Sequence, residues 1–161
     1  MVAALGAGGT GEVYRTRDTR LDRTVAIEVL PAELSTDPER RTRFEREARA
    51  ISTLNHPHIC TLHDVGEQAG QAYLVMEHLA GETLAERLKK GPLPLAQALE
   101  IGAQIAEALD TAHKHGIVHR ELKPGNVMLT KAALETHAAL AAAGWPGAAL
   151  HRADALLFVG R

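Results

Sequence analysis

Residues 5–13 read LGAGGTGEV, a cluster of glycines followed directly by residues that favour β-strands. The G-x-G-x-x-G spacing from Gly6 to Gly11 fits a plain hairpin turn, a dinucleotide-binding fingerprint, or a lid over nucleotide phosphates. A dinucleotide site needs a helix to begin right after the last glycine, whereas residues 12–14 continue into a predicted strand. In a strand–turn–strand lid, the missing Cβ atoms let backbone N–H groups approach phosphate oxygens. The context therefore disfavours the dinucleotide site.

The composition predicts a globular chain. Of 161 residues, 45% are hydrophobic and 24% are charged, which is enough for a sizeable core. A net charge of -2 argues against non-specific binding to nucleic acids or anionic membranes as the main activity. A single cysteine, Cys60, cannot form an internal disulfide, and no apolar run reaches the ~18 residues of a membrane span. The first residues resemble neither a signal nor a transit peptide, so we expect a cytoplasmic location.

The first half of the chain is predicted to form a sheet with one helix. Strands are expected on both sides of the glycine cluster and after a polar turn at residues 18–23. A helix is expected within residues 35–54, with Asp37 as its N-cap and Pro38 at its first position. Its apolar face comprises Phe44, Ala48, Ile51 and Leu54. Two further strands, at 58–65 and 71–79, are separated by the turn-forming GEQAG and suggest an antiparallel pair.

The second half is predicted to be helical. Thr83 and Glu86 have the spacing of a capping box, and the short helix that they begin should stop at Gly91. A longer helix within 95–116 has apolar residues at helical spacing, namely Ala98, Ile101, Ile105, Leu109 and Ala112. Residues 79–81 are expected to form a hinge between two lobes. In the alanine-rich residues after Lys131, one helix is expected before a Gly-Trp-Pro-Gly turn, and the segment 149–159 fits either a helix or a strand.

Five stretches, in this order, resemble the protein-kinase family and in particular the bacterial serine/threonine kinases: LGAGGTGEV, VAIEVL, FEREARAISTLNHPHI, YLVMEHLAGETL and HRELKPGN. The resemblance implies an α+β fold, with an antiparallel β small lobe and its helix C in residues 1–79. An incomplete helical large lobe with the catalytic loop follows in 80–130, and the tail 131–161 is atypical. The family's activity is transfer of the ATP γ-phosphoryl group to protein serine or threonine, with Mg²⁺ as the metal.

The resemblance also implies roles for individual residues. The nucleotide-binding positions are Leu5, Gly6, Ala7, Gly8, Gly9, Thr10, Gly11, Val13, Ala26, Glu28, Glu47, Met76, Glu77, His78 and Leu79. Among them, Glu47 is the glutamate of helix C, Met76 the gatekeeper, and residues 77–79 the adenine-binding hinge. In the catalytic loop, Glu121 would accept the substrate's proton, Lys123 would steady the transferred phosphate, and Asn126 would hold magnesium. His119 and Arg120 precede these residues and are interpreted as structural.

Three departures from the family pattern predict impaired chemistry. Glu121 replaces an aspartate, and a shift of about 1 Å from its extra methylene costs on the order of 100-fold in rate. Glu28 stands where the family has lysine. If Glu28 and Glu47 were 4 Å apart, they would repel by roughly 4 kcal/mol at an effective dielectric of 20, so the helix should swing away or one carboxyl should stay protonated. No Asp-Phe-Gly occurs in the sequence: residues 138–140 read AAL, and only Asp154 offers a later acid.

Three hypotheses follow from this pattern. The first is a serine/threonine kinase-like domain with impaired or absent phosphoryl transfer and weak binding of ATP and Mg²⁺. The second is a pseudokinase-like module that binds a nucleotide or a protein partner without catalysis, and the third is a non-functional kinase fragment. His56, His58 and His63 give no metal signal, because neither zinc-type spacing nor a cysteine pair accompanies them. The stretch NHPHI is instead expected to pack the loop after the helix. His113 and His115 are expected to cap a helix end.

Overall fold

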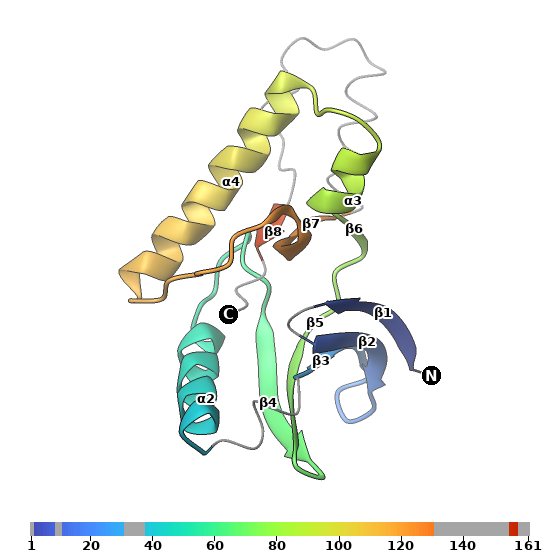
Figure 1. Cartoon of the computed structure of the whole chain (residues 1–161), viewed down its shortest axis with the longest axis vertical. Helices are drawn as coiled ribbons and strands as arrows, with labels where there is room; N and C mark the ends of the chain where they lie inside the picture. Colours follow the sequence, from blue (N-terminus) through green and yellow to red (C-terminus); the bar gives the residue numbers. More distant parts are fainter. Residues whose placement is uncertain (1, 9–10, 31–37, 131–154, 158–161) are drawn as a thin grey trace. The chain divides into compact units, whose positions relative to one another are not determined.

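The computed structural model describes residues 2–8, 11–30, 38–130 and 155–157 (Figure 1). The elements are β1 (Ala3–Gly8), β2 (Gly11–Asp18), β3 (Arg23–Val29), α2 (Pro38–Ser52), β4 (Leu62–Gln68), β5 (Gln71–Glu77), β6 (Gly81–Thr83), α3 (Leu84–Lys89), α4 (Leu95–Lys114), the 3₁₀ helix η1 (Pro124–Asn126), β7 (Val127–Thr130) and β8 (Ala155–Leu157). The contacts divide the chain into two units. The first comprises Met1–Asn55 and Thr61–His78, and the second comprises His56–Cys60 and Leu79–Arg161.

The first unit contains a five-stranded antiparallel sheet in the order β1-β2-β3-β5-β4. The predicted strands on both sides of the glycine cluster and after the polar turn are confirmed in β1 to β3. The turn between β2 and β3 is fixed by the Asp18 carboxylate, which accepts hydrogen bonds from the backbone N–H groups of Arg20 (3.0 Å) and Leu21 (3.2 Å). This local bonding is the usual way in which an aspartate begins a turn.

The hairpin of β4 and β5 is antiparallel, as predicted, but its boundaries differ from the expectation. Strand β4 begins at Leu62 rather than His58, and it runs through the first three residues of GEQAG. The turn consists of Ala69 and Gly70 alone, with φ values of 52° and 79°. Positive φ at both central residues is the requirement of a two-residue hairpin turn whose twist matches its strands. The glutamate and glutamine of this segment therefore extend the strand.

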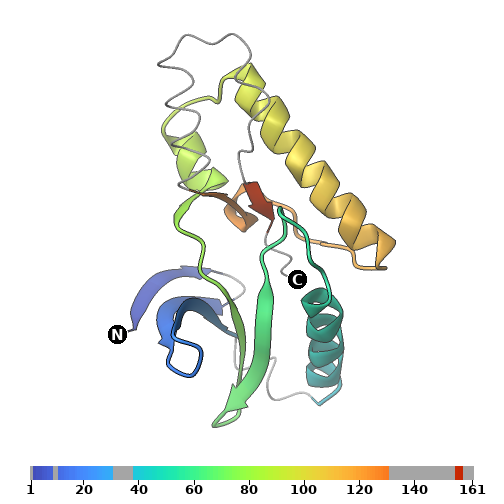
Figure 2. The same ribbon diagram turned by 180° about the vertical axis from the view of Figure 1, so that it is seen from behind.

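Helix α2 lies beside β4 in both views and packs on one face of the sheet (Figure 2). Phe44 is 6% exposed and forms a core cluster with Leu30 and Ala72. Ala48, one turn further on, is buried too. Leu54 is buried as predicted, but it lies beyond the helix, which ends at Ser52. The predicted N-cap Asp37 lies outside the described residues.

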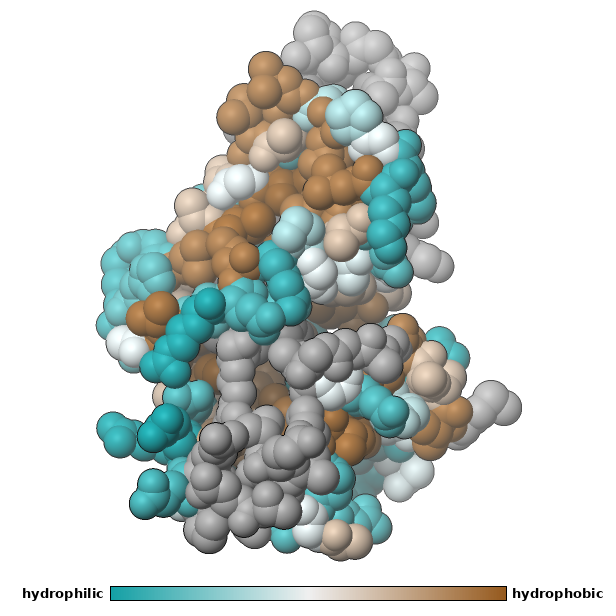
Figure 3. All heavy atoms as spheres, in the orientation of Figure 1, coloured by the Kyte–Doolittle hydropathy of each residue, from teal (hydrophilic) through white to brown (hydrophobic). Residues whose placement is uncertain are grey.

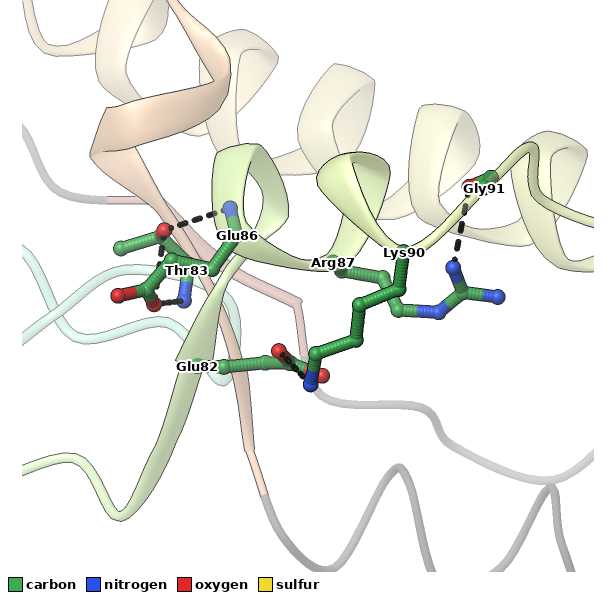
Figure 4. Close-up of polar contacts among 6 residues, drawn as sticks. All are labelled: Glu82, Thr83, Glu86, Arg87, Lys90 and Gly91. Carbon is green, nitrogen blue, oxygen red and sulfur yellow. Dashed lines mark hydrogen bonds and ion pairs between the residues drawn. The ribbon is translucent and has the colours of Figure 1, made fainter.

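The second unit contains α3, α4 and a three-stranded antiparallel sheet in the order β6-β7-β8. The predicted capping box begins α3 (Figure 4): the Thr83 hydroxyl accepts from the Glu86 N–H at 3.1 Å, and the Glu86 carboxylate accepts from the Thr83 N–H at 2.8 Å. The same close-up shows Lys90 bonded to Glu82. Both ends of this short helix are therefore held by side chains close in sequence.

Helix α4 confirms the predicted long helix. Ile101 and Ala112 of the predicted apolar face are buried, Ile105 and Leu109 are half-buried, and Ala98 is exposed. Figure 3 shows apolar residues gathered over this helix. Leu95 and Leu99 of the helix are exposed. β8 shows that the segment 149–159 contains a strand, at residues 155–157. The helix predicted before the Gly-Trp-Pro-Gly turn lies outside the described residues.

Candidate functional site

The glycine cluster lies where β1 and β2 meet. Gly8 pairs with Gly11 across this hairpin, and Gly9 and Thr10 lie outside the described residues. Gly11 has φ of 141°, and a Cβ at this position would run into the carbonyl oxygen of Val29. Only glycine fits this close approach of β2 to β3 without strain. Leu5, Gly6 and Ala7 belong to β1, and the Leu5 side chain is exposed.

Four of the predicted nucleotide-binding residues share one face of the sheet. Val13 pairs with Glu28, and Ala26 pairs with Met76, so strand register brings these side chains together. Ala26 and Met76 are 6% and 4% exposed. Three of the four side chains on this surface are apolar. The exception is Glu28, whose side chain is 4% exposed.

Glu28 lies on the face of the sheet that carries helix α2. Alternation along β3 places Glu28 on the same side as Leu30, and Leu30 packs against Phe44 of α2. Glu47, the half-buried glutamate predicted as the partner from helix C, follows Phe44 by three residues on this helix. The structure therefore places two acidic residues on facing elements of the first unit. A lysine at position 28 would bring a cation to this face, whereas Glu28 brings a second carboxyl group.

The predicted hinge begins with a residue that is fixed within the first unit. The Glu77 backbone N–H donates to the Thr61 carbonyl at 3.0 Å, and its carboxylate accepts from the Thr61 N–H at 2.7 Å. These two bonds join the end of β5 to the residue before β4. His78 and Leu79 follow it and are half-buried. Thr61 was not found from the sequence, because nothing in the local pattern links positions sixteen residues apart.

The predicted catalytic loop lies in the second unit and is closed by its own hydrogen bonds. The Glu121 N–H donates to the His119 carbonyl at 2.8 Å, and His119 itself is 3% exposed. Arg120, between them, has φ of 63°, a conformation that non-glycine residues rarely adopt. This burial and tight turning of the chain agree with the structural interpretation of the two residues. The strand after the loop, β7, is anchored by Val127 and Leu129, both at most 2% exposed.

The acidic residue of the loop forms an ion pair with its lysine. The Lys123 Nζ lies 2.5 Å from Glu121 Oε1, with the two side chains 46% and 41% exposed. An exposed pair of this kind adds little stability, because water screens it. The ion pair nevertheless engages both side chains that, by resemblance to the family, would act on the substrate and the transferred phosphate. The sequence predicted both residues but gave no sign that they would bind each other.

Asn126 is oriented by the backbone of the same loop. Its Nδ2 donates to the Glu121 carbonyl at 3.0 Å, and its own N–H donates to the Lys123 carbonyl at 2.9 Å. With the amide nitrogen engaged, Oδ1 remains as the kind of hard oxygen ligand that Mg²⁺ prefers. Within the described ranges, no group of three or more His, Cys, Asp and Glu residues is arranged to hold a metal ion. The described donor set therefore supplies one oxygen from Asn126 and does not fit a complete magnesium site.

The histidines and the cysteine near the end of α2 are packing residues in this structure. His58 is 5% exposed, and its Nε2 lies 3.8 Å from Glu107 Oε2 of α4 in the same unit. The ring of His56 accepts the backbone N–H of His58 at 3.1 Å. Cys60 is buried. Packing of the loop after the helix, as predicted, accounts for these residues.

Comparison with known families and proteins agrees with this arrangement. The family described as "Protein kinase domain" matches residues 1–137. The chain therefore belongs to the protein kinase family, and the kinase-like α+β fold predicted from the sequence is confirmed. In the part of the chain that the structure describes, no helix combines the length and the apolar character needed to cross a bilayer.

The similar proteins are bacterial serine/threonine kinases. The chain is 46% identical over 132 residues to the probable serine/threonine-protein kinase SCO3848 of Streptomyces coelicolor, covering 79% of this chain and 20% of that protein. It is 45% identical over 131 residues to serine/threonine-protein kinase PknB of Mycobacterium leprae, covering 78% and 21%. The crystal structure of the Mycobacterium tuberculosis PknI kinase domain matches with a TM-score of 0.77 and 31% identity, covering 96% of this chain and 56% of that one. The chain thus spans about a fifth of the curated relatives it matches.

Proposed function

We propose that this chain is a serine/threonine kinase-family domain in which phosphoryl transfer is impaired or absent. The observation that carries the proposal is the burial of Glu28 on β3, at the position where the family has lysine. A lysine there would attract the phosphates of ATP, whereas a glutamate repels them. At 4 Å and an effective dielectric of 20, each such interaction amounts to roughly 4 kcal/mol, so the reversal is large.

The catalytic loop adds a second, smaller impairment. Glu121 carries its carboxylate one methylene further out than the family's aspartate, and there it meets Lys123 at 2.5 Å. In this ion pair the Glu121 carboxylate is bonded to Lys123, the residue that would steady the transferred phosphate. A displacement of about 1 Å of the reacting group costs on the order of 100-fold in rate by itself.

Nucleotide or partner binding without catalysis is the second candidate, and the apolar surface of Val13, Ala26 and Met76 favours it. These residues match the family positions that contact adenine, and they are intact. ATP, and a protein substrate or partner, are the ligands that we propose for the chain. Adenine binding at this surface does not require the phosphate-binding charges to be present.

The test uses the whole chain with ATP, Mg²⁺ and a general protein substrate such as casein. We expect phosphate incorporation no greater than that of Glu121→Ala. We also expect that ATP raises the melting temperature to the same extent with and without Mg²⁺, since any ligand of the folded state stabilises it. Robust incorporation that disappears in Glu121→Ala would contradict the proposal.

A variant that puts back the family's lysine at position 28 tests the reason for the impairment. Glu28→Lys should raise ATP affinity by at least about tenfold, given the charge reversal. Glu67→Lys makes the same change in net charge at an exposed position of β4 and should leave affinity within about twofold. Equal effects of the two variants would show that overall charge, rather than the position of Glu28, limits binding.

A further inference from the structure

The sheet of the first unit is apolar on both of its faces. Residues of β3 and β5 alternate between the face that α2 covers and the opposite face. The opposite face carries Ile27 paired with Val75 and Val29 paired with Tyr73, and all four side chains are half-buried. An antiparallel sheet that is covered on one side ordinarily has a polar second face. The second apolar face therefore marks a surface suited to an apolar ligand.

A hollow of about 700 Å³ lies on this second face. We call it the outer hollow; its floor is Val25, Ile27, Val29, Tyr73 and Val75. Its wall comes from the turn between β2 and β3 and from β4. The volume lies within the range of about 300–1,000 Å³ that small-molecule sites occupy. The floor and the wall belong to the same unit of the chain.

The wall of the outer hollow is more basic than acidic. It contains three arginines and two aspartates, Arg17, Arg20, Arg23, Asp18 and Asp64. Arg17 pairs with Asp22 (Nε to Oδ1, 2.8 Å), and Arg23 lies 3.4 Å from Asp18. In the described part of the chain, the Arg20 side chain makes no hydrogen bond or ion pair. Arg20 is therefore a cation at the wall that is available to a ligand.

The histidine of the wall adds a polar contact but no charge at neutral pH. Burial, together with the nearby Arg23, lowers the pKa of His63, against the weaker opposite effect of Glu77 and Asp18. A neutral imidazole offers one donor and one acceptor. The wall thus combines one available guanidinium with a hydrogen-bonding ring.

We propose that the outer hollow binds a small amphipathic anion, a molecule with an apolar body and a negatively charged end. The apolar body lies on Ile27, Val75 and Tyr73, and the charged end faces Arg20, because a guanidinium binds oxyanions through paired N–H groups. A second copy of the chain is the alternative occupant of this face, because a twofold contact sets a patch against itself.

The test is a titration of the whole, methyl-labelled chain with decanoate, followed by NMR. We expect saturable shifts of the Ile27 and Val75 methyl signals, and at least about fivefold weaker binding of decyltrimethylammonium, which has the same alkyl chain and a positive end. Arg20→Ala should weaken decanoate binding by about fivefold. Arg46→Ala removes an exposed arginine of α2 in the same unit and should change nothing.

Absence of saturable shifts in the wild-type chain overturns the proposal without recourse to any variant. Equal affinity for the two alkyl ligands, or equal effects of the two arginine variants, overturns it as well. Sedimentation velocity on the same samples addresses the other occupant: a dimer whose dissociation shifts the same methyl signals would assign this face to self-association instead. None of these measurements involves nucleotide, so their outcome is independent of the proposed kinase-family function.

Discussion

Replacement of Phe44 by alanine should destabilise the first unit by about 4 kcal/mol. An aromatic side chain buries about 150–250 Å², and at ~25 cal/mol per Å² the lower figure alone amounts to about 4 kcal/mol. The ring is 94% buried, being 6% exposed, against Leu30 and Ala72. A hollow of about 230 Å³, lined also by Val65, already adjoins it. Removal of the ring enlarges this space, so the neighbours cannot close it by a small shift.

The assay is urea denaturation followed by far-UV circular dichroism, with the free energy of unfolding extrapolated to water. Phe44→Leu keeps an apolar side chain of similar reach and should cost less than about 1.5 kcal/mol. Leu21→Ala truncates a 65% exposed side chain in the same unit and should stay within about 0.5 kcal/mol. Suppose that Phe44→Ala costs less than about 1 kcal/mol and leaves unchanged the slope of the unfolding free energy against urea concentration. Then α2 is not held to the sheet by this ring, and our account of the core is wrong.

Two predictions concern the capping box of α3. Thr83→Ala removes the hydroxyl that accepts the Glu86 N–H and should cost about 1 kcal/mol in the same denaturation assay, whereas Thr83→Ser, which keeps the hydroxyl, should recover most of it. Hydrogen bonds from Thr83, chiefly its backbone N–H, hold the pKa of Glu86 below its usual 4.5. The contribution of the Glu86 carboxylate to folding stability is therefore complete above about pH 4.5. It is lost as the pH falls through the lower pKa that Glu86 has in the folded state. Glu86→Gln should therefore lose less melting temperature on acidification than the wild-type chain does. An equal loss in the two proteins would show that the Glu86 carboxylate is not the source of the pH dependence.

Local patterns in the sequence were sufficient wherever the interacting residues are close neighbours. The capping box at Thr83 was predictable because its two partners are three residues apart and both bonds form within one turn. Phe44 and Ala48 were assigned to one buried face because helical spacing alone brings them together. The start of β4 was wrong by four residues, since the segment His56–Cys60 belongs to the second unit instead of entering the sheet.

The residues of the candidate site stay a prediction, and their contacts could not be foreseen from the sequence. Resemblance of short motifs identified Glu28, Glu121 and Lys123, because their positions within those motifs are fixed. The burial of Glu28 depends on strand pairing with Val13 and Leu74, which lie far away in the sequence. The ion pair of Glu121 with Lys123 joins two side chains of one loop, and no composition rule predicts it.

The segment His56–Cys60 has a consequence for any attempt to dissect the protein. It lies between α2 and β4 in the sequence but folds with the second unit, where His58 faces Glu107. The polypeptide therefore passes between the units three times, after residues 55, 60 and 78. A fragment cut at residue 78 would keep these five residues and lose the remainder of the unit they fold with, including the helix that His58 faces. The small lobe should accordingly resist expression as an autonomous piece, and limited proteolysis should release no stable N-terminal half.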